Sequence, residues 1–171
     1  MNNRWFFVII QMLVISVNLY AAGFVVDPSA IKAISVPLAK NYEIFNSSGT
    51  DKYFLSIKNT KSAPSRYRIE IMSCKAYGIK PRAGYGDIPV FDKKSSSHHK
   101  NEWIKIESPD ISVPPLEVGY VKGVYVKIPK KKEYYGKRYQ AIVKVIQEAA
   151  VGSGMNLEVV LPLWIETENK P

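Results

Sequence analysis

The chain has 171 residues and a formal net charge of +9, from 24 Lys and Arg against 15 Asp and Glu. Its single cysteine, Cys74, excludes an intramolecular disulfide, so its stability must come from packing. A chain of this length is expected to form one domain with a sizeable core. The positive charge favours anionic polymers or lipid surfaces as partners, and it is equally consistent with solubility alone.

The first 23 residues have the pattern of a signal peptide. Arg4 supplies a positive charge, Trp5–Val17 form an apolar run, and Ala21–Gly23 supply small residues at a cleavage site. We therefore expect residues 1–23 to be cleaved and residues 24–171 to form a single exported domain; the alternative is an uncleaved N-terminal anchor. An exported chain with one cysteine fits a periplasmic or extracellular bacterial location.

Alternation of apolar and polar residues, which is typical of strands with one buried face, dominates the rest of the chain. The expected strands, in chain order, are Ile31–Pro37, Tyr53–Asn59, Arg66–Met72, Trp103–Glu107, Val124–Ile128, Tyr139–Gln147 and Leu157–Ile165. Turn-forming clusters separate them, and no segment has a sustained helical period. About seven short strands with such turns predict an all-β fold, an immunoglobulin-like antiparallel β-sandwich.

One long segment, Lys75–Glu102, separates two expected core strands. It has three glycines, two prolines and a polar tract, so we expect an irregular excursion with a short strand near Ile88–Phe91. The only histidines, His98 and His99, are adjacent and have no ligand-like spacing to an acid or a cysteine. This pattern indicates a solvated loop, and we expect no metal site.

The segment Trp103–Ile146 carries a recognisable order of elements. An aromatic-led strand is followed by Pro114-Pro115, an alternating V-x-V-x-I-P strand, a turn with Tyr and Gly, and a Y-x-A-x-V strand. Together with the paired strands of Tyr53–Ile71, it resembles bacterial extracytoplasmic immunoglobulin-like domains, namely the N-terminal domain of periplasmic pilus-assembly chaperones and related cell-surface domains. The resemblance implies a sandwich fold and a protein partner bound at a strand.

The chain differs from that family at the family's binding cleft, where a partner's carboxylate is held. The resemblance implies a basic pair there, one residue on the first strand and one on the last. Lys32 lies on the first strand, but the last, Asn156–Glu168, has no basic residue. Carboxylate capture is therefore not expected.

The last strand is the first candidate site. A position in the core explains the alternation of this strand, but apolar residues also lie on its other face. A strand with two apolar faces is either covered by another segment of the chain or binds a partner by strand addition. Pro162 interrupts the ladder and favours an edge or bulge position. The candidate partner-binding residues are Leu157, Val159, Val160, Leu161, Leu163 and Trp164.

A basic cluster is the second candidate site. Its members are Lys130, Lys131, Lys132, Lys137 and Arg138, with Tyr134 and Tyr135 between them. One interpretation is the polar turn of a β-hairpin, in which Gly136 supplies a positive φ. The other is an anion-binding surface that is completed by Lys93, Lys94 and Lys100 of the long segment.

Two functions follow from these candidates. The first is a non-enzymatic binding module that engages an envelope or pilus-like protein by strand addition. The second is a structural or adhesive envelope protein that holds an anionic cell-wall polymer or lipid surface through its lysine-rich turns. No catalytic signature such as G-x-S-x-G occurs, so we expect no enzyme, no cofactor, no small-molecule substrate and no nucleic-acid partner.

Overall fold

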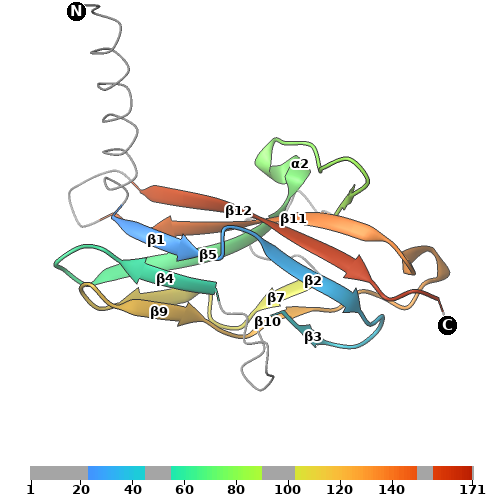
Figure 1. Cartoon of the computed structure of the whole chain (residues 1–171), viewed down its shortest axis with the longest axis horizontal. Coiled ribbons are helices and arrows are strands. Elements are labelled where there is room, and N and C mark those ends of the chain that lie inside the picture. The colour runs from blue at the N-terminus through green and yellow to red at the C-terminus, as the bar shows by residue number, and fades with distance from the viewer. Residues whose placement is uncertain (1–22, 45–54, 90–102, 150–155, 171) are drawn as a thin grey trace, which may run out of the picture.

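The structure is a computed structural model, and it describes residues 23–44, 55–89, 103–149 and 156–170. Two layers of strands pack face to face over most of this part of the chain (Figure 1). The strands are β1 (Phe24–Asp27), β2 (Ile31–Val36), β3 (Tyr42–Glu43), β4 (Leu55–Asn59), β5 (Ser65–Ser73), β6 (Gly86–Asp87), β7 (Ile104–Ile106), β8 (Asp110–Val113), β9 (Val118–Val121), β10 (Val124–Val126), β11 (Arg138–Gln147) and β12 (Leu157–Thr167). Two short helices, α2 (Cys74–Tyr77) and the 3₁₀ helix η1 (Lys132–Tyr134), interrupt them. The expected all-β, immunoglobulin-like sandwich is confirmed.

One layer is a six-stranded sheet in the order β2-β12-β11-β5-β8, with β6 added beside β11. The other layer consists of two three-stranded sheets, β1-β4-β9 and β3-β10-β7. Strands β9 and β10 follow one another with only Lys122 and Gly123 between them. Gly123 has a φ of 68°, and a side chain at that position would collide with Glu107, so the break between the two smaller sheets requires glycine.

The core lies between the layers and is built by alternate residues of both. Tyr67 and Ile69 of β5 and Val143 of β11 face Leu55 and Ile57 of β4, and all five are buried. Strand β11 is also buried on its outward face, at Ile142 and Ile146, as its doubly apolar sequence predicts. It is the central strand of its sheet, between β12 and β5.

Consecutive strands do not pair as a hairpin around the basic cluster. β10 belongs to a three-stranded sheet and β11 to the six-stranded one, so the connection between them crosses from one layer to the other. The hairpin interpretation of this turn is wrong. Alternation of apolar and polar residues shows which face of each strand is buried. It does not show which strands pair, because two strands in opposite layers alternate in the same way as the two strands of a hairpin.

Several strands give no clear signal in the sequence. β9 points Val118 and Tyr120 outward and Gly119 toward β8, where a side chain would collide with Ile111 and Val113. Two of its large apolar residues are therefore exposed and only Val121 is buried, which departs from the usual pattern. A short strand, β6, lies directly before the strand expected near Ile88–Phe91, and Val90 and Phe91 lie outside the described residues.

Within the described ranges, no helix has the length and apolar character that a membrane span requires. The apolar run of residues 5–17 lies outside those ranges. Its expected role as a signal peptide stays a prediction.

Candidate functional site

Strand β12 is paired unequally on its two sides. β11 accompanies it in antiparallel register from Leu157 to Glu166. On the other side, β2 pairs with it in parallel only from Leu163 onward. The preceding strand, β1, pairs with β4 in the opposite layer and so does not extend β2 along β12 (Figure 1). Among the described residues, the segment from Leu157 to Pro162 therefore has a free edge.

The direction of the backbone groups on that edge follows from two hydrogen bonds at the end of β12. Thr167 N–H donates to Lys137 O at 2.9 Å, on the β11 side, and Glu168 N–H donates to Val36 O at 3.0 Å, on the β2 side. Because these directions alternate along a strand, the odd-numbered residues of β12 face β11 and the even-numbered ones face away from it. The free edge is thus formed by the backbone groups of Glu158, Val160 and Pro162, and Pro162 has no N–H to offer.

Side-chain burial falls along β12 toward its start. Leu161 and Leu163 are buried, Val159 and Val160 are half-buried, and Leu157 is 36% exposed. Beside this open half, Lys144 Nζ lies 2.7 Å from a carboxylate oxygen of Glu158. That hydrogen bond raises the pKa of Lys144. The free edge thus has apolar side chains on both faces and one neutralised charge pair.

The other half of β12 is covered. The ring of Trp164 lies 6.4 Å from that of Tyr85 and 5.7 Å from the guanidinium carbon of Arg82. Both residues belong to the loop between α2 and β6, which lies within the described part of the long segment. Two of the candidate residues, Leu163 and Trp164, pair with β2 and lie in the closed half. The other four lie along the free edge: Leu157, Val159, Val160 and Leu161.

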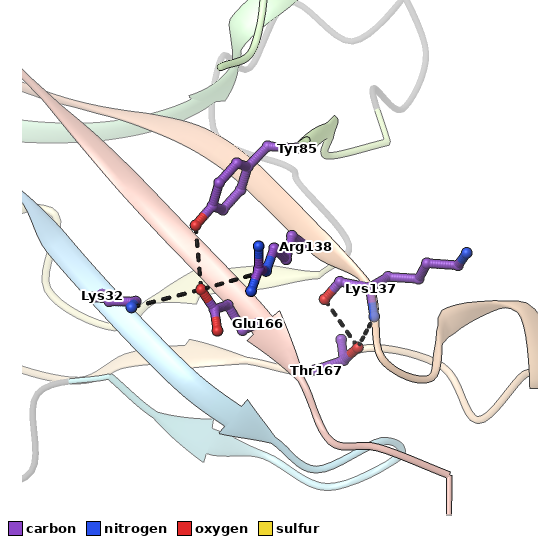
Figure 2. Close-up of polar contacts among 6 residues, drawn as sticks. All are labelled: Lys32, Tyr85, Lys137, Arg138, Glu166 and Thr167. Carbon is purple, nitrogen blue, oxygen red and sulfur yellow. Dashed lines mark hydrogen bonds and ion pairs between the residues drawn. The ribbon is translucent and has the colours of Figure 1, made fainter. Parts of the chain in front are cut away.

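Figure 2 shows three side chains directed at Glu166 in this covered half. The Tyr85 hydroxyl donates to Glu166 Oε1 at 3.2 Å, and Lys32 Nζ and Arg138 Nε lie 3.6 Å and 3.7 Å from the same oxygen. Lys32 thus has a carboxylate partner within its own chain. Nothing in the sequence signals this arrangement, because the four residues come from four separate segments.

The loop that covers Trp164 is fixed by hydrogen bonds. The Asp87 carboxylate accepts from the backbone N–H groups of Cys74 and Lys75, each at 2.8 Å, and the Gln140 side chain accepts from Arg82 N–H at 2.8 Å. Cys74 is fully buried, and burial, followed by the charge of Asp87, raises the pKa of its thiol to about 11. A thiol that stays protonated at neutral pH is a poor nucleophile.

The tyrosines of the basic cluster have a structural role. Tyr134 packs edge-on against Trp103 at 5.1 Å, and its carbonyl accepts a hydrogen bond of 2.6 Å from the Thr167 hydroxyl. Tyr139 completes the same aromatic group, 5.0 Å from Trp103. These rings close the end of the sandwich where the chain crosses between layers, so Tyr134 is not a free stacking surface.

The basic side chains of this cluster have different surroundings. Lys130, Lys131 and Lys132 are all exposed, and Lys131 Nζ lies 5.6 Å from the centre of the Tyr134 ring. Arg138 points to Glu166, whereas Lys137 points away from it (Figure 2). Lys93, Lys94 and Lys100, which the anion-binding interpretation also needs, lie outside the described residues.

Residues with the chemistry of a metal centre do not gather in the part of the chain that the structure describes. No group of three or more His, Cys, Asp or Glu lies there at ligand distance. His98 and His99 are outside it.

Comparison with known proteins identifies the fold. No protein-family model matches the sequence, and no curated protein matches it. Among solved structures, a PapD-like domain of human CEP192 (domain 7) has a TM-score of 0.54 at 8% identity, with 88% of each chain covered. The chaperone DraB of E. coli has a TM-score of 0.50 at 8% identity, and the match covers 84% of this chain but 55% of DraB.

These matches are distant in sequence, so they establish the fold alone. They confirm the expected immunoglobulin-like sandwich, whose fold is similar to that of a PapD-like domain and of the chaperone DraB. The chain has the fold of an immunoglobulin-like β-sandwich, and its described strands are similar in arrangement to a PapD-like domain.

Proposed function

We propose that this chain is a non-enzymatic, exported binding module that holds an extended segment of an envelope or pilus-like protein by strand addition. The observation that carries the proposal is the free edge of β12 from Leu157 to Pro162. A partner strand there would continue the line of β2 and would make backbone hydrogen bonds with Glu158 and Val160. Export rests on the signal-peptide pattern of residues 1–23.

The side chains along this edge fit such a partner. Leu157 is exposed, and Val159 and Val160 are half-buried on opposite faces. A free edge with apolar side chains would aggregate unless it is protected or occupied. Pro162 limits the free ladder to a few residues, which favours one short partner segment over an extended assembly of strands.

The fold adds support of a general kind. DraB, which shares this sandwich, is a chaperone, and a chaperone acts on another protein. At 8% identity this likeness names no partner for the present chain, so the proposal depends on the geometry of β12.

A single proline tests the proposal. The N–H of Val160 faces the free edge and that of Val159 faces β11, so Val160→Pro removes a donor needed by a partner and none needed by the fold. Pro162 already occupies an equivalent position in the same strand. We expect Val160→Pro to keep its circular dichroism spectrum and to lose about tenfold or more in binding, because a lost backbone hydrogen bond and the steric block of the ring together exceed about 1.4 kcal/mol.

The partner would be captured by a photo-crosslinking residue at Glu158 of the full chain, in bacterial cells that export it, and identified by mass spectrometry. Val160→Ala is the matched control, because it keeps the N–H and should retain the cross-link. Equal cross-linking of a folded Val160→Pro variant and the parent chain would exclude strand addition at this edge.

The alternative, an anionic polymer held by the basic cluster, receives less support. Arg138 is engaged by Glu166, and Lys137 points in another direction. A salt-dependent interaction abolished by Lys130/Lys131/Lys132→Glu would favour that alternative, because exposed charges are screened within about 8 Å at physiological ionic strength.

A further inference from the structure

Exposed apolar side chains gather at one place that the proposed function does not use. Seven large apolar side chains are exposed in the described residues, and four of them belong to the outward face of the β1-β4-β9 sheet or to the turn before β9. These four are Val25, Leu116, Val118 and Tyr120, with exposed fractions from 42% to 67%. We call them, together with Lys58, the apolar face.

The strand register places these residues side by side. Val25 of β1 pairs with Lys58 of β4, which pairs with Val118 of β9, so a lysine stands between two valines. In the next row, Ser56 pairs with Tyr120. Cross-strand neighbours on one face of a sheet lie in contact distance, so the row of Val25, Lys58 and Val118 forms a continuous surface.

Leu116 extends this face at the turn between β8 and β9. It is the most exposed of the four at 67%, and its φ of 60° is unusual for a residue with a side chain. The turn is held firmly: Leu116 N–H donates to Lys61 O at 3.2 Å, and the side chain of the buried Asn59 donates to Val113 O and Pro114 O, each at 3.1 Å. A rigid turn therefore presents Leu116 to the surroundings.

The described chain begins at the same end of the sandwich. Thr60 N–H donates to Gly23 O at 3.2 Å, and Thr60 precedes Lys61 of the Leu116 turn. The sequence before Gly23 includes the apolar run of residues 5–17, which brings the chain to a membrane during export and, as an uncleaved anchor, would hold it there. The apolar face thus adjoins the point where a membrane-seeking sequence joins the domain.

The charges around the face distinguish a lipid surface from a protein partner. Lys58, Lys61 and Lys122 are exposed around it, against the acidic Asp27 and Glu117. Lysine is depleted in the centre of protein interfaces. At a bilayer, however, its aliphatic stem can lie along apolar groups while its ammonium reaches a lipid phosphate. We propose that the apolar face rests on an anionic phospholipid surface, with Leu116 entering the headgroup region and Lys58 binding phosphate.

Fluorescence quenching tests contact at the face itself. The full chain carrying Leu116→Trp would be mixed with vesicles of phosphatidylcholine and phosphatidylglycerol whose acyl chains are brominated. We expect quenching beyond that of the parent chain, whose three native tryptophans set the baseline, and a blue shift of the additional emission. Lys58→Gln in the same chain should weaken the contact by about fivefold, since one lysine near an anionic surface contributes about 1 kcal/mol.

The matched control is Ile34→Trp, because Ile34 is also an exposed aliphatic residue, at 52%, but lies beside Gly136 and Asn169 instead. Quenching in excess of that of the parent chain, which carries the native Trp5, Trp103 and Trp164, should be absent for this variant even if residues 1–22 hold the chain to the vesicle. Three outcomes would overturn the inference. The first is no quenching at position 116, and the second is equal quenching at positions 116 and 34. The third is quenching that is the same on pure phosphatidylcholine and unaffected by Lys58→Gln. None of these outcomes bears on the free edge of β12, so the two proposals stand or fall separately.

Discussion

The two halves of strand β12 have the same sequence pattern and different surroundings. From Leu163 to Thr167 the strand lies between β11 and β2, and a loop covers Trp164 on its outward face. From Leu157 to Pro162 it has β11 on one side and no strand on the other among the described residues. Alternation therefore reports which face of a strand is buried, and it does not report whether the edge is occupied.

The backbone explains this difference. β2 pairs with β12 over a short register only, and β1 pairs with the opposite layer instead of continuing along β12. The closed half is stabilised by hydrogen bonds on both edges. The open half keeps one row of backbone donors and acceptors that has no strand partner among the described residues.

Hydrogen exchange of the isolated protein gives the largest expected contrast between the halves. The amide of Val160 should exchange rapidly because it faces the free edge, whereas those of Val159 and Trp164 should be protected by β11 and β2. Protected amides of a core strand open with free energies near that of global unfolding, about 5 kcal/mol or more, so the rates should differ by about 10³-fold or more. NMR would resolve each amide. Slow exchange at Val160 in the monomer would show that the edge is already occupied.

Truncation of one leucine in each half gives the next largest effect. Leu163 is fully buried and Leu157 is 36% exposed. Leu163→Ala should lower the free energy of unfolding by about 2–5 kcal/mol, because it leaves a cavity in the core. Leu157→Ala should lower it by less than about 1 kcal/mol while weakening partner capture. Urea unfolding of both variants measures this, and equal destabilisation would mean that Leu157 is a core residue.

The sandwich could be predicted from the sequence because its core strands follow one simple rule. Tyr67, Ile69 and Ile71 alternate with charged residues and are all buried. Strand β9 could not be predicted, because it exposes Val118 and Tyr120 and has glycine on its other face. The pairing of the strands could not be predicted from the sequence either. The basic cluster was therefore open to interpretation as a hairpin turn, whereas it is a crossover between the two layers.

The candidate site could be predicted in part. The doubly apolar pattern of Leu157–Ile165 singled out β12, and Pro162 indicated an edge position, which the structure bears out for one half. The cover over Trp164 could not be foreseen, because Arg82 and Tyr85 lie far away in the sequence within an irregular loop. Their binding to Trp164 depends on how that loop folds back, and no local pattern encodes this.

The smallest expected effects concern one glutamate in each half. Glu166 links Lys32 of β2 to Arg138 of β11, whereas Glu158 forms its ion pair with Lys144 of β11. Exposed or half-exposed ion pairs contribute about 1 kcal/mol or less, so Glu166→Ala and Glu158→Ala should destabilise the protein by similar small amounts in urea unfolding.

Exchange of the β2 amides separates the two glutamates. Loss of Glu166 leaves Lys32 and Arg138 facing each other at the junction of β2 and β12, and their repulsion should speed exchange in Ile31–Val36. Loss of Glu158 should leave β2 unchanged because no residue of β2 contacts it. If both variants leave the β2 amides equally protected, the closed half is maintained by its backbone ladder and packing alone. The charge cluster of Figure 2 would then have no part in holding the first strand to the last.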